Sequence, residues 1–299
     1  MASRILYILV PDTHISPFDV TLAADAGFNQ ILPFTGTRPD DVVPMVQDAI
    51  FARPPGRFND TGIFIGGHNV HLAKDMFDNA RTAMVSDFQV GVFVDPNGAY
   101  TTAASVVALV EQALKKETGK GLKGRSVGVF GIGPVGICTA ILAAQQGAKA
   151  KLCQLTGDDE VKFAMRFCER YRVDVPAVSA LTHEDKIEAL ASVEVLICAA
   201  RAGIRILGKE ELDHASNLIM AADTNAVPPS GIEGIGAQDH GEPVKMAKST
   251  FLGIGALAIG NLKYKVQFGL FEKMQASDKA ALLDFQDAYA FALSTNGGK

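Results

Sequence analysis

Short apolar runs alternate with stretches of helical spacing along the first third of the chain. The apolar runs are Ile5–Val10, Gln30–Phe34, Gly62–Ile65 and Val90–Val94. Apolar residues recur every three or four positions in the stretches between and after them, at Phe18–Ala26, Asp40–Phe51, Val70–Ala83 and Thr101–Lys116. Buried strands that alternate with amphipathic helices are typical of a parallel sheet with right-handed crossovers. This part of the chain is therefore predicted to form an open parallel α/β sheet.

A glycine- and lysine-rich connector, residues 118–124, interrupts this pattern, and a second alternation follows it. The second alternation opens with a strand at Ser126–Phe130 and an apolar helix at Pro134–Gln146. Further strands are expected at Ala150–Leu155, Val195–Ala199 and Leu218–Ala222. This order is that of the doubly wound, Rossmann-type dinucleotide-binding fold.

Apolar residues return at helical spacing beyond Gly260. They are Leu270, Phe271, Met274, Leu282, Leu283, Phe285, Tyr289 and Phe291. We expect C-terminal helices that pack back on the first domain. The predicted fold is α/β with two domains: residues 1–120, joined by 268–299, form a substrate domain, and residues 121–267 form the dinucleotide-binding domain.

Composition excludes several classes of protein. The chain has 299 residues, of which 48% are hydrophobic and 20% charged, and its net charge is -5. An acidic chain without a basic patch is a poor partner for nucleic acid or an anionic membrane. The first apolar run is too short to span a bilayer. The four cysteines form no C-x-x-C pair, which indicates reduced thiols in a cytoplasmic protein.

The most informative motif is a glycine-rich turn between the predicted strand and helix. Gly131, Gly133 and Gly136 have the G-x-G-x-x-G spacing, and Pro134 and Val135 complete the segment. In this context the first glycine permits a tight turn, the second admits a pyrophosphate and the third allows close packing of helix and strand. A turn without a ligand is the alternative interpretation, and we favour dinucleotide binding.

The residues that commonly select between NAD and NADP are absent after the next strand. Neither a ribose-binding carboxylate nor a phosphate-binding arginine stands at 154–157, where Gln154 and Thr156 are found. Both side chains are candidates for hydrogen bonds to either cofactor. Either NAD or NADP is therefore expected to serve.

Two familiar dehydrogenase chemistries are excluded by missing residues. No tyrosine is followed by a lysine four positions later, and the one close histidine pair, His68 and His71, offers at most two metal ligands. We therefore expect no bound metal. A hydride transfer that needs no proton removed from oxygen fits this set of side chains.

Five segments together resemble the bacterial NAD(P)-dependent methylene-tetrahydromethanopterin dehydrogenases. They are Ser16–Val20, Gly62–Gly67, Asp95–Thr102, Asp223–Ile232 and Gly253–Lys265. The resemblance covers nearly the whole chain and is greater to the branch that accepts NAD as well as NADP. It implies oxidation of methylene-tetrahydromethanopterin, or its dephospho form, to the methenyl compound in one-carbon metabolism, where methylotrophs oxidise formaldehyde. A homo-oligomer in the cytoplasm is also expected.

Two other functions remain open at this point. A methylene-tetrahydrofolate dehydrogenase would use the same chemistry on another carrier. A non-catalytic NAD(P)-binding redox sensor would need no substrate site.

The candidate site residues follow strands, because ligands of open α/β sheets bind beyond the carboxyl ends of the strands. Lys263, Asp19 and Asp95 are the catalytic candidates, and the resemblance places Lys263 at a domain cleft. The candidates for substrate binding are His14, Asn97, Tyr100, Thr101 and Thr102. In addition to the glycine turn, Gln154 and Thr156, the candidates for cofactor binding are Ala200, Asp223 and Asn225. Asp19, Asp95 and the threonines have a structural alternative as helix caps or turn formers.

Overall fold

The computed structural model describes residues 3–54, 57–277 and 279–296. The chain divides into two compact units, Met1–Thr101 with Tyr264–Lys299, and Thr102–Lys263. The unit boundaries fall inside two long helices, α4 (Ala99–Thr118) and α9 (Ala256–Ala276). The bounds predicted from sequence were instead placed after residues 120 and 267.

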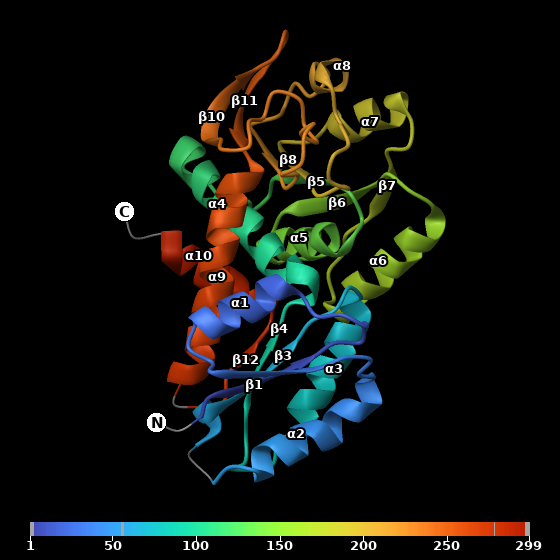
Figure 1. Cartoon of the computed structure of the whole chain (residues 1–299). Coiled ribbons are helices and arrows are strands. Elements are labelled where there is room, and N and C mark those ends of the chain that lie inside the picture. The colour runs from blue at the N-terminus through green and yellow to red at the C-terminus, as the bar shows by residue number, and fades with distance from the viewer. Residues whose placement is uncertain (1–2, 55–56, 278, 297–299) are drawn as a thin grey trace. The chain divides into compact units, whose positions relative to one another are not determined.

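The first unit is built on a parallel sheet of five strands (Figure 1). The strands are β1 (Ile5–Leu9), β2 (Gln30–Phe34), β3 (Thr61–Ile65), β4 (Gly91–Val94) and β12 (Leu282–Leu283). Their order is β2-β1-β3-β4-β12, and every neighbouring pair is parallel. The strand order reverses between β1 and β3, so the crevice for a ligand is expected beyond the carboxyl ends of these two strands.

Helices cover both faces of this sheet. They are α1 (Pro17–Asp25), α2 (Val42–Phe51), α3 (Val70–Thr82) and α10 (Phe285–Asn296), with short 3-10 turns at Pro39–Asp41, Phe58–Asp60 and Pro96–Gly98. Right-handed crossovers place α1 on one face and α2 and α3 on the other, because they cross the sheet in opposite directions.

Packing in the core of the first unit accounts for its buried aromatic residues and for one of its glycines. Phe64, Phe93 and Phe271 pack with ring centroids 5.3 Å apart. A Cβ atom on Gly62 would lie 2.8 Å from Cε of Met274 on α9, so a larger residue there would displace this helix. The outer strand β2 is the exception, since Leu32 and Phe34 are each 42% exposed.

The second unit contains a sheet of seven strands with helices between them. Its elements are β5 (Ser126–Phe130), α5 (Pro134–Gln145), β6 (Lys149–Gln154), α6 (Asp158–Arg170), β7 (Ala177–Ser179), α7 (His183–Leu190), β8 (Val195–Cys198), α8 (Lys209–Leu212), β9 (Met220–Asp223), β10 (His240–Lys245) and β11 (Thr250–Ile254). The order is β10-β11-β9-β8-β5-β6-β7, with only β10 antiparallel to its neighbour among the named pairs. This is the doubly wound order, with its switch point between β5 and β8.

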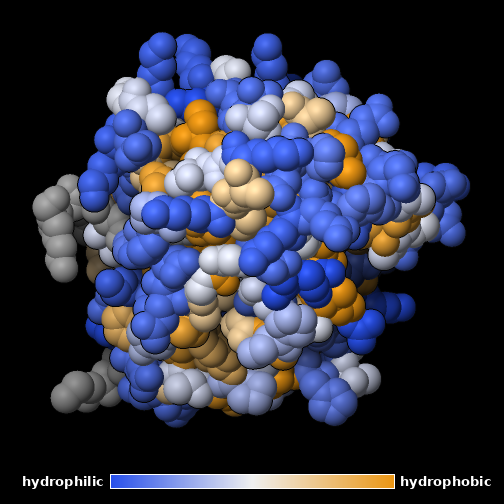
Figure 2. Space-filling model, turned by 90° about the horizontal axis from the view of Figure 1, so that it is seen from above, coloured by the Kyte–Doolittle hydropathy of each residue, from blue (hydrophilic) through white to orange (hydrophobic). Residues whose placement is uncertain are grey.

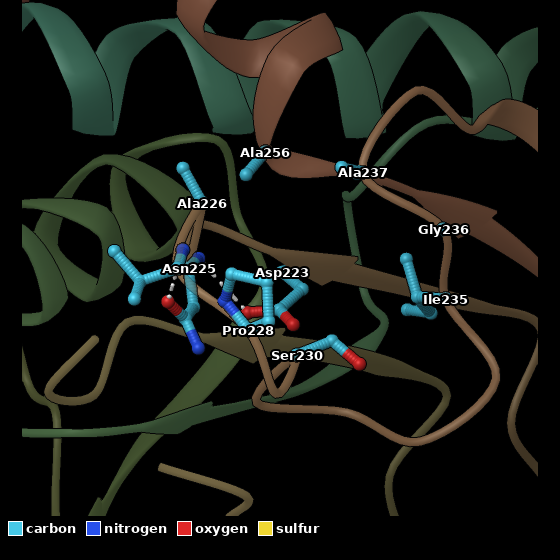
Figure 3. Close-up of a pocket in the computed structure, with 11 residues that line it drawn as sticks. Asp223, Asn225, Ala226, Pro228, Ser230, Ile235, Gly236, Ala237 and Ala256 are labelled. Carbon is cyan, nitrogen blue, oxygen red and sulfur yellow. Dashed lines mark hydrogen bonds between the residues drawn. The ribbon is translucent and has the colours of Figure 1, made fainter. Parts of the chain in front are cut away.

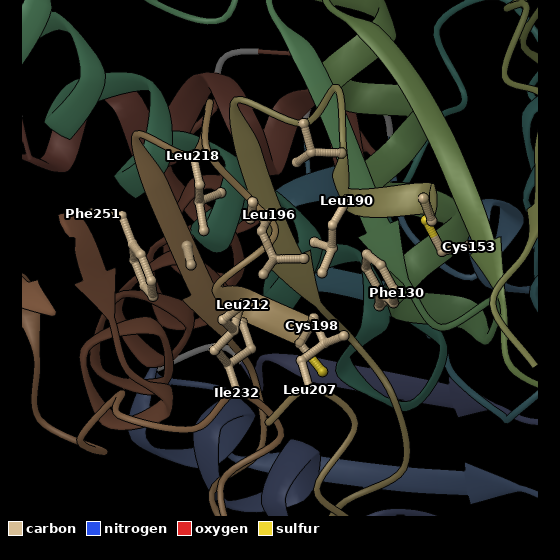
Figure 4. Packing of buried hydrophobic residues seen from close by; sticks show 14 of the residues in the cluster. Phe130, Cys153, Leu190, Leu196, Cys198, Leu207, Leu212, Leu218, Ile232 and Phe251 are labelled. Carbon is tan, nitrogen blue, oxygen red and sulfur yellow. The ribbon is translucent and has the colours of Figure 1, made fainter. Parts of the chain in front are cut away.

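Large apolar side chains fill one face of this second sheet. Figure 4 shows Phe130, Leu196, Leu212, Ile232 and Phe251 packed together, and all are at least 99% buried. In contrast, the molecular face in Figure 2 is mostly hydrophilic, with small, separated hydrophobic areas. Burial on this scale is the main source of the free energy of folding.

The fold class predicted from the sequence is confirmed, and single elements differ. The strand at Gln30–Phe34 has the predicted bounds, while α9 begins at Ala256 rather than beyond Gly260. The helical interpretation of Leu282 and Leu283 was wrong, because the two residues pair with Val92 and Phe93 as strand β12. Helical spacing misled there, since pairing at a free sheet edge depends on a neighbour that is distant in the sequence.

No helix of the described residues is long and apolar enough to cross a membrane.

Candidate functional site

The three glycines of the turn between β5 and α5 differ in the space around them. Gly131 has φ +111°, and a Cβ atom there would lie 2.6 Å from the carbonyl oxygen of Ala199 at the end of β8. A Cβ atom on Gly136 would lie 2.0 Å from the carbonyl oxygen of Gly131. A Cβ atom on Gly133 would meet nothing within 4 Å. Two of the glycines are thus required by the fold, and the third leaves open space.

The first turn of α5 is not capped by a side chain. Gly133 is its N-cap residue and makes no side-chain cap hydrogen bond, while Pro134 and Val135 follow half-buried. Two other helices differ: Asn69 caps α3 and Thr182 caps α7. N–H groups of an uncapped first turn carry partial positive charge and are suited to bind an anion.

The loop after β6 is held by its own side chains. Gln154 Nε2 donates to the carbonyl oxygen of Thr156 at 2.6 Å and to Oδ1 of Asp158 at 3.2 Å. Thr156 itself is exposed. The amide of Gln154 is therefore already engaged within the loop, and the side chain of Thr156 is accessible.

Asp223 and Asn225 organise the loop after β9. The carboxylate of Asp223 accepts the N–H of Asn225 at 3.0 Å and that of Ile232 at 3.1 Å. Burial raises the pKa of Asp223, and the backbone hydrogen bonds oppose that shift. The loop is thus folded around a buried carboxylate.

Asn225 joins this loop to the one after β8. Its Oδ1 accepts the N–H groups of Val227 at 2.9 Å and Gly203 at 3.1 Å, and its Nδ2 donates to the carbonyl oxygen of Pro229 at 2.7 Å. Asn225 therefore fixes two loops beside the end of the sheet.

A pocket of about 180 Å³ lies beside these two residues. Figure 3 shows Asp223, Asn225 and Pro228 on one side of it and Ala237 and Ala256 on another. A pocket of this volume has room for a single ring. Small side chains and backbone line much of the pocket, so a flat group can approach the chain closely.

Ala200 is the second residue after β8 and lies against the glycine turn. A Cβ atom on Gly131 would come within 2.8 Å of the nitrogen of Ala200. The structure thus brings Ala200 together with the glycine turn, and Asn225 connects the same loop to the pocket.

In the first unit, Asp95 holds the start of α4. Its Oδ1 accepts the N–H groups of Tyr100 at 2.8 Å and Thr101 at 3.2 Å, and its Oδ2 accepts the hydroxyl of Thr101 at 2.6 Å. All three residues are fully buried. The ring of Tyr100 packs edge-on against Phe285 at 5.0 Å between centroids. The exposed Asn97 stands beside them in the left-handed region with φ 50°.

Asp19 is a buried carboxylate in the first turn of α1. Its Oδ1 accepts Nε2 of Gln267 at 2.6 Å, and only 6% of the residue is exposed. Gln267 did not stand out in the sequence, because the two residues are 248 positions apart.

His14 lies exposed after β1, with Nδ1 2.8 Å from the hydroxyl oxygen of Thr13. Thr102 on α4 and Lys263 on α9 belong to the second unit, and both are half-buried.

A polar contact that sequence reasoning missed bridges the switch point of the first sheet. Asp12 Oδ2 accepts the N–H of His68 at 2.9 Å and lies 2.7 Å from Nδ1 of the same histidine. The carbonyl oxygen of Asp12 accepts the N–H of Gly36 at 2.9 Å. Asp12 thus ties the loops after β1, β2 and β3 together. The position of Asp12 just after a strand was the only available signal.

The described residues include no group of three or more His, Cys, Asp and Glu side chains arranged to hold a metal ion.

Comparisons with known proteins show a relationship over the whole chain. Residues 17–97 match the family described as methylene-tetrahydromethanopterin dehydrogenase, N-terminal. The NAD(P)-dependent methylenetetrahydromethanopterin dehydrogenase of Methylorubrum extorquens is 43% identical, covering 99% of this chain and 100% of that protein. The bifunctional protein MdtA of the same organism is 31% identical over 98% of this chain and 99% of its own length.

Among solved structures, the shikimate 5-dehydrogenase of Listeria monocytogenes in complex with shikimate and NAD is similar with a TM-score of 0.53. It is 14% identical, and the match covers 90% of this chain and 91% of that one. This likeness supports the α/β fold alone.

Proposed function

Because the chain belongs to the NAD(P)-dependent methylenetetrahydromethanopterin dehydrogenase family, we propose that it oxidises methylene-tetrahydromethanopterin to the methenyl compound with NAD or NADP as oxidant. The observation that carries this proposal is the 43% identity to the Methylorubrum dehydrogenase over 99% of the chain. The dephospho form of the carrier is included, since nothing in the described residues selects between the two.

The second unit is proposed to bind the cofactor. The open space at Gly133 and the uncapped first turn of α5 fit a diphosphate, which needs close backbone approach and oriented N–H groups. This part of the proposed site is also shaped by Gly131, Pro134, Val135, Gly136 and Ala200. The remaining proposed cofactor residues are Gln154, Thr156, Asp223 and Asn225.

The pocket beside Asp223 is proposed to hold the nicotinamide. Its volume of about 180 Å³ suits one ring, and Asn225 links its rim to the loop after β8. Asp223 acts there by holding the loop, because its carboxylate is turned toward backbone N–H groups.

The first unit is proposed to bind the pterin beyond the carboxyl ends of its strands. His14 and Asn97 are exposed there and are proposed to contact the substrate. Tyr100, Thr101 and Asp95 are buried and are proposed to position the start of α4. Asp19 of the first unit, and Thr102 and Lys263 of the second unit, are the other residues proposed for the substrate. A carboxylate and an ammonium at the substrate provide electrostatic stabilisation and orientation.

The proposed reaction is a single hydride transfer. The methylene carbon of the substrate bridges two nitrogens, and its C–H bond breaks with both electrons. When bound, the oxidised nicotinamide supplies the acceptor for this hydride. A nitrogen lone pair of the substrate completes the C=N bond of the methenyl cation, so no proton is released and no general base is needed. The protein positions the reactants, which lowers the barrier by several kcal/mol in comparable reactions.

A spectrophotometric assay that crosses two pterins with NAD and NADP tests this function. We expect cofactor reduction with methylene-tetrahydromethanopterin, and much less with methylene-tetrahydrofolate. Absence of reduction with the former would contradict the proposal. A His14→Ala variant should raise KM for the pterin and leave the dissociation constant of NADH unchanged, since His14 lies in the first unit.

A cytoplasmic homo-oligomer is proposed as its working form. All four cysteines are free and buried, which supports a reducing compartment. Light scattering of the purified protein measures the number of subunits, and a monomer at micromolar concentration would contradict the oligomer.

A further inference from the structure

Cationic side chains are scarce at the carboxyl end of the dinucleotide-binding sheet. The loops that follow its parallel strands are residues 131–133, 155–157, 180–182, 199–208, 224–239 and 255. Lysine and arginine occur in them only at Arg201 and Arg205. Within these loops, Arg201 and Arg205 are therefore the two side chains that can supply positive charge to a bound anion.

Arg205 is already engaged. Its Nε donates to the carbonyl oxygen of Ser230 at 2.6 Å, and its guanidinium lies 3.2 Å from the carboxylate of Glu233. Arg201 is exposed, and its guanidinium makes no hydrogen bond or ion pair with any described residue. Of these two loop arginines, Arg201 is therefore the one whose guanidinium is available to a ligand.

The backbone places Arg201 beside the glycine turn. Ala199 and Ala200, directly before it, lie within 2.6 and 2.8 Å of a Cβ atom built on Gly131. Two residues later, Gly203 donates to Asn225 at 3.1 Å. The loop that carries Arg201 thus runs between the glycine turn and the pocket beside Asp223, which is the path that a diphosphate would follow from one to the other.

The strand order distinguishes two anionic groups that Arg201 could bind. In the order β8-β5-β6, the glycine turn follows β5, the immediate neighbour of β8. A 2′-phosphate of NADP would lie beyond β6, one strand farther, and neighbouring strands are about 4.8 Å apart. Arg201 follows β8 and is therefore nearer to the diphosphate.

We propose that Arg201 binds the diphosphate of the dinucleotide and neutralises charge that the N–H groups of α5 alone leave uncompensated. This inference rests on the proposed function, because it takes the dinucleotide as the ligand. A planar guanidinium suits phosphate oxygens through paired hydrogen bonds. An arginine that binds the diphosphate contributes equally to NAD and NADP binding, so it adds affinity without selecting between them.

The test compares Arg201→Gln with Arg166→Gln, which removes the same charge from the exposed face of α6 in the same unit. Dissociation constants are measured by fluorescence titration of NADH and NADPH, and by calorimetry for ADP and AMP. Melting temperatures confirm that both variants are folded. Because hydrogen bonds to charged groups are strong, we expect Arg201→Gln to weaken the binding of NADH and NADPH by about tenfold or more. The binding of ADP should weaken by a similar factor, and that of AMP by less.

The salt dependence gives a second readout. The affinity of the unchanged protein for NADH should fall more steeply with rising ionic strength than the affinity of the Arg201→Gln variant does. The reason is that salt screens the ion pair between Arg201 and the diphosphate, which the variant lacks. A loss no larger than that of Arg166→Gln would overturn the proposal, as would a loss confined to NADPH. If the unchanged protein bound neither NADH nor NADPH, the proposed function itself would fail, before any variant is compared.

Discussion

Each unit contains a glycine-rich turn that leads from a buried strand into a helix, and the two turns differ in what they leave open. In the first unit, Gly66 and Gly67 lead from β3 to α3, where Asn69 Oδ1 accepts the N–H groups of His71 at 2.9 Å and Leu72 at 3.2 Å. In the second unit, no side chain caps α5, and the space at Gly133 is open.

The comparison shows that glycines after a strand do not by themselves make an anion site. The α3 turn is closed by its own side chain, so an incoming anion would have to displace Asn69. The α5 turn offers its N–H groups to a ligand. We therefore assign cofactor binding to the second turn, and the following experiments challenge that distinction.

The largest effect is expected from Gly133→Val. Its side chain would enter the space assigned to the diphosphate, so NADH affinity should fall by more than about a hundredfold, or about 2.7 kcal/mol. Because nothing lies within 4 Å of a Cβ atom there, the melting temperature should change little. Titration with NADH and thermal melting measure the two quantities.

Gly136→Val is the matched control for this substitution. Its Cβ atom would lie 2.0 Å from the carbonyl oxygen of Gly131, so this variant should lose stability as well as affinity. Unchanged NADH affinity in a folded Gly133→Val protein would remove the basis for the assignment.

Asp95→Ala should give the next largest effect, on stability. The substitution removes the carboxylate that accepts the N–H groups of Tyr100 and Thr101 and the shorter of the two hydrogen bonds of the Thr101 hydroxyl, in a fully buried site. We expect a loss of about 2 to 3 kcal/mol in the free energy of unfolding. Urea denaturation measures it, and a loss below about 0.5 kcal/mol would show that Asp95 does not hold α4.

Asn69→Ala tests the closed turn directly. Loss of an N-cap costs about 1 kcal/mol of stability, and NADH affinity should be unchanged because the proposed cofactor site lies in the second unit. Thermal melting and NADH titration of the variant and the unchanged protein measure the two quantities. If NADH affinity fell severalfold, the α3 turn would have to be included in the cofactor site.

The smallest effect is expected at the thiols. Burial raises the pKa of Cys153 and of Cys198 to about 12 and that of Cys168 to about 11. These groups therefore stay protonated at pH 8 and should not react with a thiol reagent in the folded protein. In denaturant all four cysteines should react, and rapid labelling of the native protein at pH 8 would contradict their burial.

The sequence was most informative where a backbone conformation demands one residue type. Gly131 needs φ +111°, and Gly136 leaves no room for a side chain, so the spacing of the glycines identified the turn. The alternation of apolar runs with helical stretches likewise predicted parallel α/β sheets, because helices must cover both faces of such a sheet.

Contacts between distant residues could not be read in the same way. Asp12 and His68 join the loops after two different strands and are 56 positions apart, and Asp19 and Gln267 are 248 positions apart, so no local pattern reports either pair. Similarly, β10 is an edge strand with mostly exposed residues and lacks the apolar run of a buried strand. Such features depend on tertiary neighbours, which a single sequence does not reveal.

The central claim, hydride transfer from the methylene carbon to the nicotinamide, is tested most directly by isotope transfer. Methylene-tetrahydromethanopterin carrying deuterium on the methylene carbon is incubated with the protein and NAD in ordinary water, and the reduced cofactor is analysed by mass spectrometry. The account predicts that the deuterium transferred from the carbon appears in NADH, without exchange with solvent. Reduced cofactor that contains only solvent hydrogen, or no reduced cofactor at all, would contradict it.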